Sequence, residues 1–187
     1  MTYSLNTLNA DRAQPSPGGV SRFAQEIGLL LGAAGLLFWL LALLSHSMAD
    51  PAWSTTGTRA EVGNWGGRFG AVVADVSYYL LGFSVWWVLL AGLRTWLSAL
   101  AGWIRGQQGV KDDPVAPLDE GRWTRFLRSR SAFWLGLVLL VVCSSALEWS
   151  RLYRFELALP GHAGGVPGRL LGPVAERWLG FNGSTLV

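Results

Sequence analysis

Three apolar runs, separated by polar segments, dominate the pattern of this chain. The first, residues 27–44, contains no charged side chain and no strong polar group. It reaches the roughly 18 residues that a transmembrane helix needs, and it lacks the polar stripe of a helix in a soluble protein. The other two runs cover residues 70–93 and 132–147. The pattern therefore predicts three membrane spans.

The first run has a second interpretation, a cleavable signal peptide. Arg12 and Arg22 precede it, and residues 47–49 offer small side chains for cleavage. Its apolar core is, however, longer than the roughly 7 to 15 residues of a signal sequence. An uncleaved anchor is the preferred interpretation.

Amphipathic segments flank the spans. Trp96, Leu100 and Trp103 recur at helical spacing, which is typical of a helix that extends a span or lies in the headgroup layer. Residues 169–179 predict a short amphipathic helix that is interrupted near Pro173. The predicted fold class is all-α: a polytopic helical membrane domain of three transmembrane helices with short amphipathic interfacial helices.

The basic residues indicate an orientation. The loop 94–131 carries seven of them, whereas the segment 45–69 carries two. The positive-inside rule then places this loop in the cytoplasm and the segments 45–69 and 148–187 in the periplasm. The tail 1–21, rich in Pro, Gly and Ser, is predicted to be disordered and cytoplasmic. The Arg cluster suits anionic lipid better than DNA, because it adjoins a span and the net charge is only +3.

Two features suggest helix contacts or chemistry inside the membrane. Gly28 and Gly32 fall four residues apart, as in small-residue rows where helices approach closely, either within the chain or between two copies. Asp75 is the one ionisable residue that the pattern places within a span. It could pack helices at the interface or belong to an ion pathway. No metal or cofactor is expected, since His46 has no Cys or second His nearby.

Short motifs occur in a fixed order relative to the spans. The segment after the first span contains Asp50, Pro51, Ala52, Trp53 and Ser54. The start of the second span contains Asn64, Gly67, Gly70, Ala71, Ala74 and Asp75, and a glycine-rich stretch, 164–168, follows the third span. Together they resemble the N-terminal membrane domain of the FtsK family of bacterial cell-division DNA translocases, over most of residues 22–183.

The resemblance implies four spans, then a linker and a hexameric ATP-driven DNA motor in the cytoplasm. The sequence stops near Ser184, where a fourth span should begin, so we expect a fragment with that span truncated and the motor domain absent. The lone lysine, Lys111, is not set in a phosphate-binding loop. We therefore expect no enzymatic activity of this chain, and contact with DNA and ATP only through the missing motor.

The sequence leaves three functions open. The first, implied by the resemblance, is a membrane anchor that localises a translocase to the division septum of the inner membrane, self-associates and contacts other divisome membrane proteins in cell division and chromosome segregation. The second is a channel or transporter fragment with Asp75 in an ion pathway. The third, a membrane enzyme, lacks paired groups, because no serine in a span has a histidine beside it. The anchor is the preferred hypothesis.

Overall fold

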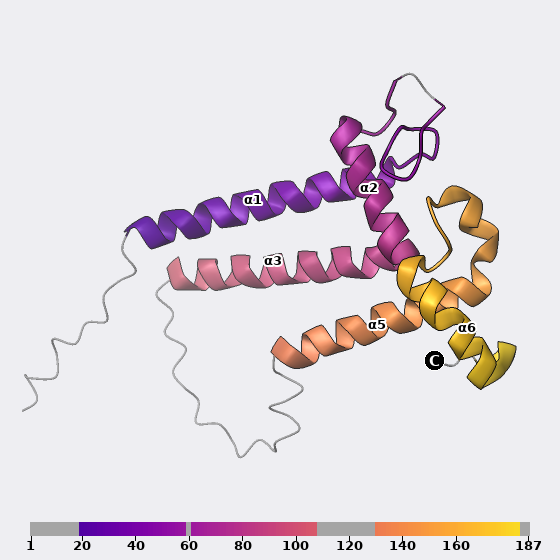
Figure 1. Cartoon of the computed structure of the whole chain (residues 1–187). Coiled ribbons are helices and arrows are strands. Elements are labelled where there is room, and N and C mark those ends of the chain that lie inside the picture. Colours follow the sequence, from indigo (N-terminus) through magenta and orange to yellow (C-terminus); the bar gives the residue numbers. More distant parts are fainter. Residues whose placement is uncertain (1–18, 59–60, 108–129, 184–187) are drawn as a thin grey trace, which may run out of the picture.

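The computed structural model describes residues 19–58, 61–107 and 130–183, and its regular elements are helices. In chain order they are α1 (Gly19–Leu44), α2 (Gly67–Leu81), η2 (Gly82–Ser84), α3 (Val85–Gln107), α5 (Arg130–Arg151), η3 (Tyr153–Ala158) and α6 (Gly165–Gly183). Figure 1 shows α1, α3 and α5 as three long rods side by side, with α3 running opposite to the other two. We call the remainder, residues 45–58, 61–84 and 152–183, the cap, because it gathers at one end of the rods.

The membrane fold class predicted from the sequence is confirmed. Among the described residues, three helical stretches are long and apolar enough to cross a membrane: Arg22–Leu44, Gly67–Gly106 and Arg130–Arg151. Large apolar side chains such as Leu30 and Leu135 point outward from the rods and are mostly exposed. Lipid is the solvent that such a surface requires. The third span is longer than the predicted 132–147, because α5 takes residues from both flanks.

The second apolar run, predicted as one helix over 70–93, is divided in the structure. Gly82 has a φ of 60° and donates its N–H to the carbonyl of Tyr78, which ends α2. The turn η2 then redirects the chain into α3, so α2 is inclined to the rods (Figure 1). A left-handed backbone costs little only for glycine, so the break depends on that residue type. Periodicity alone does not reveal it.

The loop expected over 94–131 begins later than predicted. Helix α3 continues to Gln107, so Trp96, Leu100 and Trp103 extend a span, one of the two arrangements that their spacing allowed. The rest of that loop, 108–129, and residues 1–18 of the predicted tail lie outside the described residues, whereas residues 19–21, predicted as part of the disordered tail, belong to α1. Near the other end of the chain, α6 runs through Pro173, and its non-helical residue is Gly180 instead.

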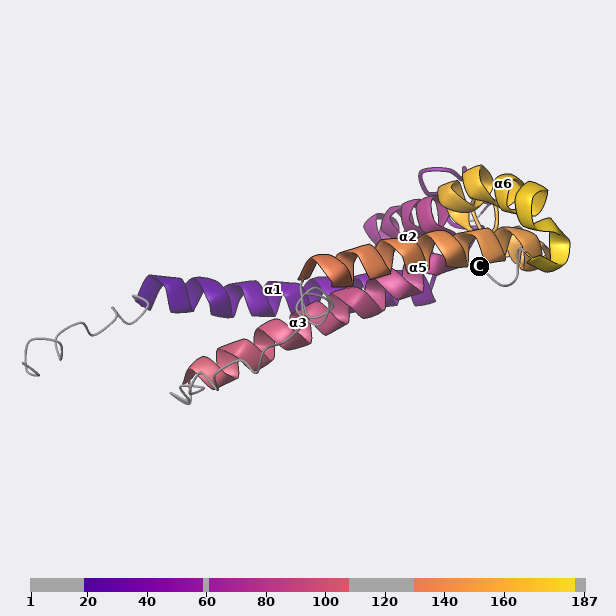
Figure 2. The same cartoon turned by 90° about the horizontal axis from the view of Figure 1, so that it is seen from below.

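The buried core lies where the rods meet the cap. Its cluster joins Ala42 and Leu43 at the end of α1 with Tyr78 of α2 and Val85 of α3. Figure 2 shows the rods separating with distance from this end, while α2 and α6 remain together beside it. Packing is therefore concentrated at the cap, and the opposite ends of α1 and α3 leave space between them.

Candidate functional site

A buried carboxylate fastens the loop after α1 to α2. Asp75 has no exposed surface, and it accepts hydrogen bonds from the backbone N–H of Ser54 at 2.7 Å and from its hydroxyl at 2.8 Å. Trp53, next in the loop, lies edge-on to the Tyr79 ring at a centroid distance of 5.2 Å. A carboxylate that receives two such bonds is satisfied where it lies. Asp75 thus holds the loop onto the helix.

A second carboxylate organises the loop itself. Asp50, 1% exposed, accepts the N–H of Gly63 at 2.9 Å through Oδ1, while its Oδ2 has no hydrogen-bond partner among the described residues. Pro51 follows it in a turn that closes against Gly57, whose φ is 68°. The described parts of the loop after the first span, 45–58 and 61–66, therefore have a defined shape, although they contain no regular secondary structure.

Small residues allow α2 to lie close to the end of α1. The amide of Asn64 donates to the carbonyl of Ala42 at 2.9 Å, and a Cβ at Gly70 would collide with that side chain. Ala71 and Ala74 are buried beside Gly70 on α2. Gly67 differs, because a Cβ there would meet nothing, but its φ of 63° favours glycine.

His46 lies half-buried in the same part of the cap. Its ring is 5.0 Å from that of Tyr78, and its Nε2 is buried with no hydrogen-bond partner among the described residues. Burial lowers the pKa of His46, because a charged imidazole would lose its hydration; nearby Asp75 and Asp50 act in the opposite direction. Burial therefore favours the neutral form of His46.

A third carboxylate was missed by the sequence analysis. Glu148 is 4% exposed and lies within α5, so the prediction that Asp75 is alone among ionisable residues in a span is wrong. It accepts the hydroxyl of Ser84 at 2.5 Å and the N–H of Phe83 at 2.8 Å. Ser144, one turn before it, also donates to it at 3.2 Å. The error arose because the apolar run ends at Leu147 whereas the helix continues to Arg151.

Glu148 also brings the glycine-rich stretch into the cap. A Cβ on Gly82 would lie 2.7 Å from Oε2 of Glu148 and from the backbone nitrogens of Gly164 and Gly165. Gly168 lies against the carbonyl of Ser145. Close backbone contact here needs residues without side chains. Gly164 and Gly165, in the glycine-rich stretch after the third span, thus pack directly against Gly82 at the break between α2 and α3.

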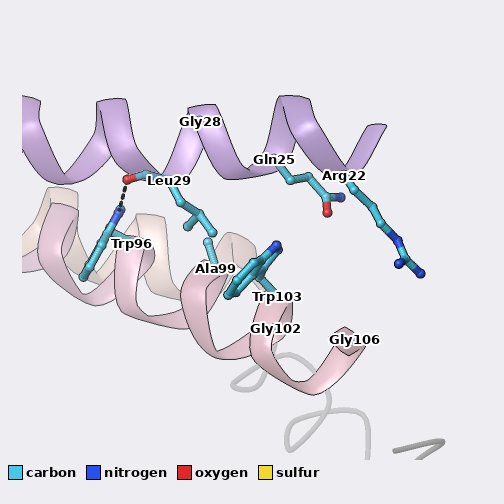
Figure 3. Close-up of a pocket in the computed structure, with 9 residues that line it drawn as sticks. All are labelled: Arg22, Gln25, Gly28, Leu29, Trp96, Ala99, Gly102, Trp103 and Gly106. Carbon is cyan, nitrogen blue, oxygen red and sulfur yellow. Dashed lines mark hydrogen bonds between the residues drawn. The ribbon is translucent and has the colours of Figure 1, made fainter. Parts of the chain in front are cut away.

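The two glycines of the first span lie elsewhere and have different surroundings. At Gly32 a Cβ would be 2.9 Å from the Trp96 ring, so this residue makes a close contact within the chain. At Gly28 a Cβ would meet nothing, because the residue lines an open groove of about 690 Å³ between α1 and α3 (Figure 3). The structure therefore brings ten of the twelve candidate residues to the cap and leaves Gly28 and Gly32 between the rods.

The buried polar groups of the cap and of the adjoining end of α5 connect segments of the chain. Asp75, Glu148 and Asn64 each bond to a segment far away in the sequence. Within the described ranges, no group of three His, Cys, Asp or Glu side chains could hold a metal ion. The arrangement fixes the ends of three long apolar helices to one another.

Comparisons with known proteins agree on one family. The sequence model of the 4TM region of DNA translocase FtsK/SpoIIIE matches residues 21–187. "DNA translocase FtsK 2" of Ralstonia nicotianae is 33% identical over 97% of this chain and 22% of its own length. "DNA translocase FtsK" of Pseudomonas aeruginosa is 33% identical over 89% of this chain and 19% of its own length. No solved structure matches the chain.

The extent of these matches limits what they imply. The chain spans about a fifth of the length of the curated relatives it matches. The shared part is the membrane region, and the motor domain is not included. The similarity therefore concerns the membrane-embedded part of those proteins.

Proposed function

Because this chain belongs to the FtsK/SpoIIIE family of DNA translocases and forms the membrane region, we propose that it anchors a translocase in the bacterial inner membrane and localises it to the division septum. The observation that carries the proposal is the cap: three apolar rods end in one polar assembly fixed by buried carboxylates. Such an assembly gives the anchor a shaped surface on one side of the membrane.

The cap offers contact groups to other membrane proteins of the divisome. Trp53, Trp65 and Trp178 are 64%, 70% and 82% exposed. Exposed tryptophans are enriched in protein interfaces and at membrane boundaries. In this proposal, the cap faces the periplasm and the N-terminus lies in the cytoplasm. DNA and ATP are bound only by a motor domain outside this chain.

The channel hypothesis receives less support from the geometry. Asp75 is fully buried and both of its oxygens accept hydrogen bonds from Ser54, so it faces a loop of the same chain. It does not line either of the grooves along the rods. A carboxylate in an ion pathway faces water or another polar group inside the bilayer. The role of Asp75 in this proposal is to hold the cap together.

Cysteine labelling tests the orientation. In a chain carrying Cys143→Ser, Thr56→Cys in the cap should react with a membrane-impermeant thiol reagent applied to spheroplasts. Arg105→Cys in the last turn of α3 should react only after the membrane is permeabilised. The reverse labelling would refute the orientation without affecting the assignment to the membrane.

Fluorescence microscopy tests the septal role. A fluorescent fusion of the full-length translocase should collect at midcell, and the same fusion without residues 1–187 should not. An even distribution of the intact fusion over the envelope would contradict the septal part of the proposal.

A further inference from the structure

The halves of α1 and α3 that lie away from the cap enclose an open groove. Figure 3 shows its wall: Arg22 and Gln25 near the start of α1, Trp96 where the helices touch, and Trp103 between them. Its volume is about 690 Å³, within the range of roughly 300 to 1,000 Å³ typical of small-molecule sites. The groove was not predicted from the sequence.

The groove exists because glycines, which have no side chain, line part of its wall. A Cβ at Gly28, Gly102 or Gly106 would meet no atom within 4 Å, although all three residues line the wall. The closed end is set by Trp96, whose indole N–H donates to the carbonyl of Leu29 at 2.9 Å. The helices therefore touch from Trp96 towards the cap, where Gly92 lies against Leu36, and leave an apolar space along the turns on the other side of Trp96.

Charge is placed at the mouth of this apolar space. Arg22 lies there, exposed, and has no ion-pair partner among the residues that the structure describes. Arg105 lies in the last turn of α3 at the same end. Glu26 does not line this groove and borders instead a neighbouring one that shares Trp96 and Trp103 with it. An apolar wall with a cationic mouth matches an amphiphile with an anionic head.

We propose that this groove binds an anionic phospholipid, with an acyl chain along the glycine wall and the phosphate at Arg22. The bilayer supplies such molecules at high local concentration, and basic residues at a membrane surface attract their headgroups. Trp103 has the aromatic character that favours the headgroup boundary. The contact at Trp96 closes the groove on the side of the cap, so an acyl chain would enter from the end at Arg22.

Lipid retention tests the site. The full chain is purified, delipidated and titrated with phosphatidylglycerol or phosphatidylethanolamine of identical acyl chains, and bound lipids are counted by native mass spectrometry. We expect preferential retention of phosphatidylglycerol. Gly28→Leu fills the groove and should lower retention of both lipids several-fold. Arg22→Gln should lower the preference for phosphatidylglycerol roughly fivefold, the size expected from one basic residue at the surface.

Matched variants outside the groove show whether the loss of lipid is specific to the groove or follows from any added leucine or any lost arginine. Gly136→Leu places the same side chain at an open, lipid-facing glycine of α5, and Arg130→Gln removes an arginine at the start of that helix. Both should retain lipid like the unmodified chain. Circular dichroism confirms helicity, and Gly102→Leu fills the groove from the opposite helix if Gly28→Leu fails to fold.

Three results would overturn the proposal. One is equal retention by Gly28→Leu, Gly102→Leu and Gly136→Leu. Another is an unmodified chain that binds both lipids alike. The third is efficient disulfide cross-linking between two copies that carry Gly28→Cys in a bilayer, because a second copy would then occupy the groove. None of these results bears on septal localisation, so the inference and the proposed function fail independently.

Discussion

At the scale of single residues, Asp75 connects the loop after α1 to α2 through Ser54. Asp75→Ala leaves the partly buried N–H of Ser54 without its acceptor and should lower the free energy of unfolding by about 1.5 to 3 kcal/mol, the usual contribution of hydrogen bonds to a charged group. Asp75→Asn should cost less, since its amide oxygen still accepts one bond. Unfolding in mixed micelles measures both changes.

A double-mutant cycle with Ser54→Ala is the control for this contact. Removal of both partners should cost less than the sum of the single changes, because both single changes remove the bond between the Ser54 hydroxyl and Oδ1, while only Asp75→Ala also removes the backbone N–H bond to Oδ2. If the losses in the free energy of unfolding of the two single variants simply add in the double variant, Asp75 stabilises the cap through a group other than Ser54. Loss of ion flux in Asp75→Asn vesicles with unchanged stability would support the channel hypothesis instead.

His46 gives the cap a pH dependence with a definite sign. Its folded-state pKa lies below the unfolded value of about 6.5, so the unfolded chain binds the proton first as the pH falls. The stabilisation is complete above that pH and is lost on acidification towards the folded pKa. The midpoint of thermal unfolding should therefore be lower at about pH 5.5 than at about pH 7.5.

His46→Gln should reduce this pH dependence. His162 provides the matched control, because it is exposed and contacts Glu156 at the surface, so His162→Gln should leave the His46 contribution intact. If His46→Gln and the unmodified chain lose stability equally on acidification, another group is responsible.

At the scale of elements, the break between α2 and α3 depends on Gly82. Gly82→Ala adds a Cβ in a left-handed conformation, at about 1 to 2 kcal/mol, and the Cβ also overlaps Glu148 and the backbone of Gly164. We expect the cap to loosen, with faster proteolysis of the segment between α5 and α6. Limited proteolysis in micelles with intact-mass detection measures this change.

Gly67→Ala is the comparison for Gly82. Its φ of 63° is similar, but its Cβ would meet nothing, so it carries the conformational cost alone. The difference between the two variants isolates the contact with Glu148 and Gly164. Equal effects of the two substitutions would mean that the close packing around Gly82 contributes nothing.

At the scale of the whole molecule, Glu148 joins α5, η2 and the turn before α6. Glu148→Ala leaves the N–H of Phe83 and the hydroxyl of Ser84 without their acceptor. The part of the cap around α2 and η2 should then separate from the part around η3 and α6. In a full-length translocase, this variant should remain in the membrane but collect less at midcell. Quantitative microscopy and membrane fractionation measure the two properties separately.

Glu148→Gln keeps an acceptor for one of these bonds and should have an intermediate effect. Glu176→Ala, at an exposed position of α6, tests whether loss of any carboxylate from the cap has the same result. If Glu148→Ala loosens the cap but the translocase still collects normally at midcell, the folded cap is not needed for recruitment to the septum.

Some features of this protein could be predicted from its sequence and others could not. The order of Asp50, Pro51 and Ser54 before Asn64 and Asp75 was enough to indicate the family, and the family match confirms it. The hydrogen bonds between Ser54 and Asp75 were not predictable, because they join residues that are 21 positions apart. Glu148 gave a weaker signal still, since it stands one residue beyond an apolar run and its partner Ser84 is 64 positions away.

The sequence by itself determined that this is a membrane protein, because the length and hydropathy of an apolar run depend only on residues that are consecutive in the chain. It also determined the family, through the order of its motifs. Only the tertiary structure decided that the second run turns at Gly82, that Glu148 closes that turn and that glycines on α1 and α3 leave a groove. Those features depend on which distant residues meet in space, and no local pattern contains that information.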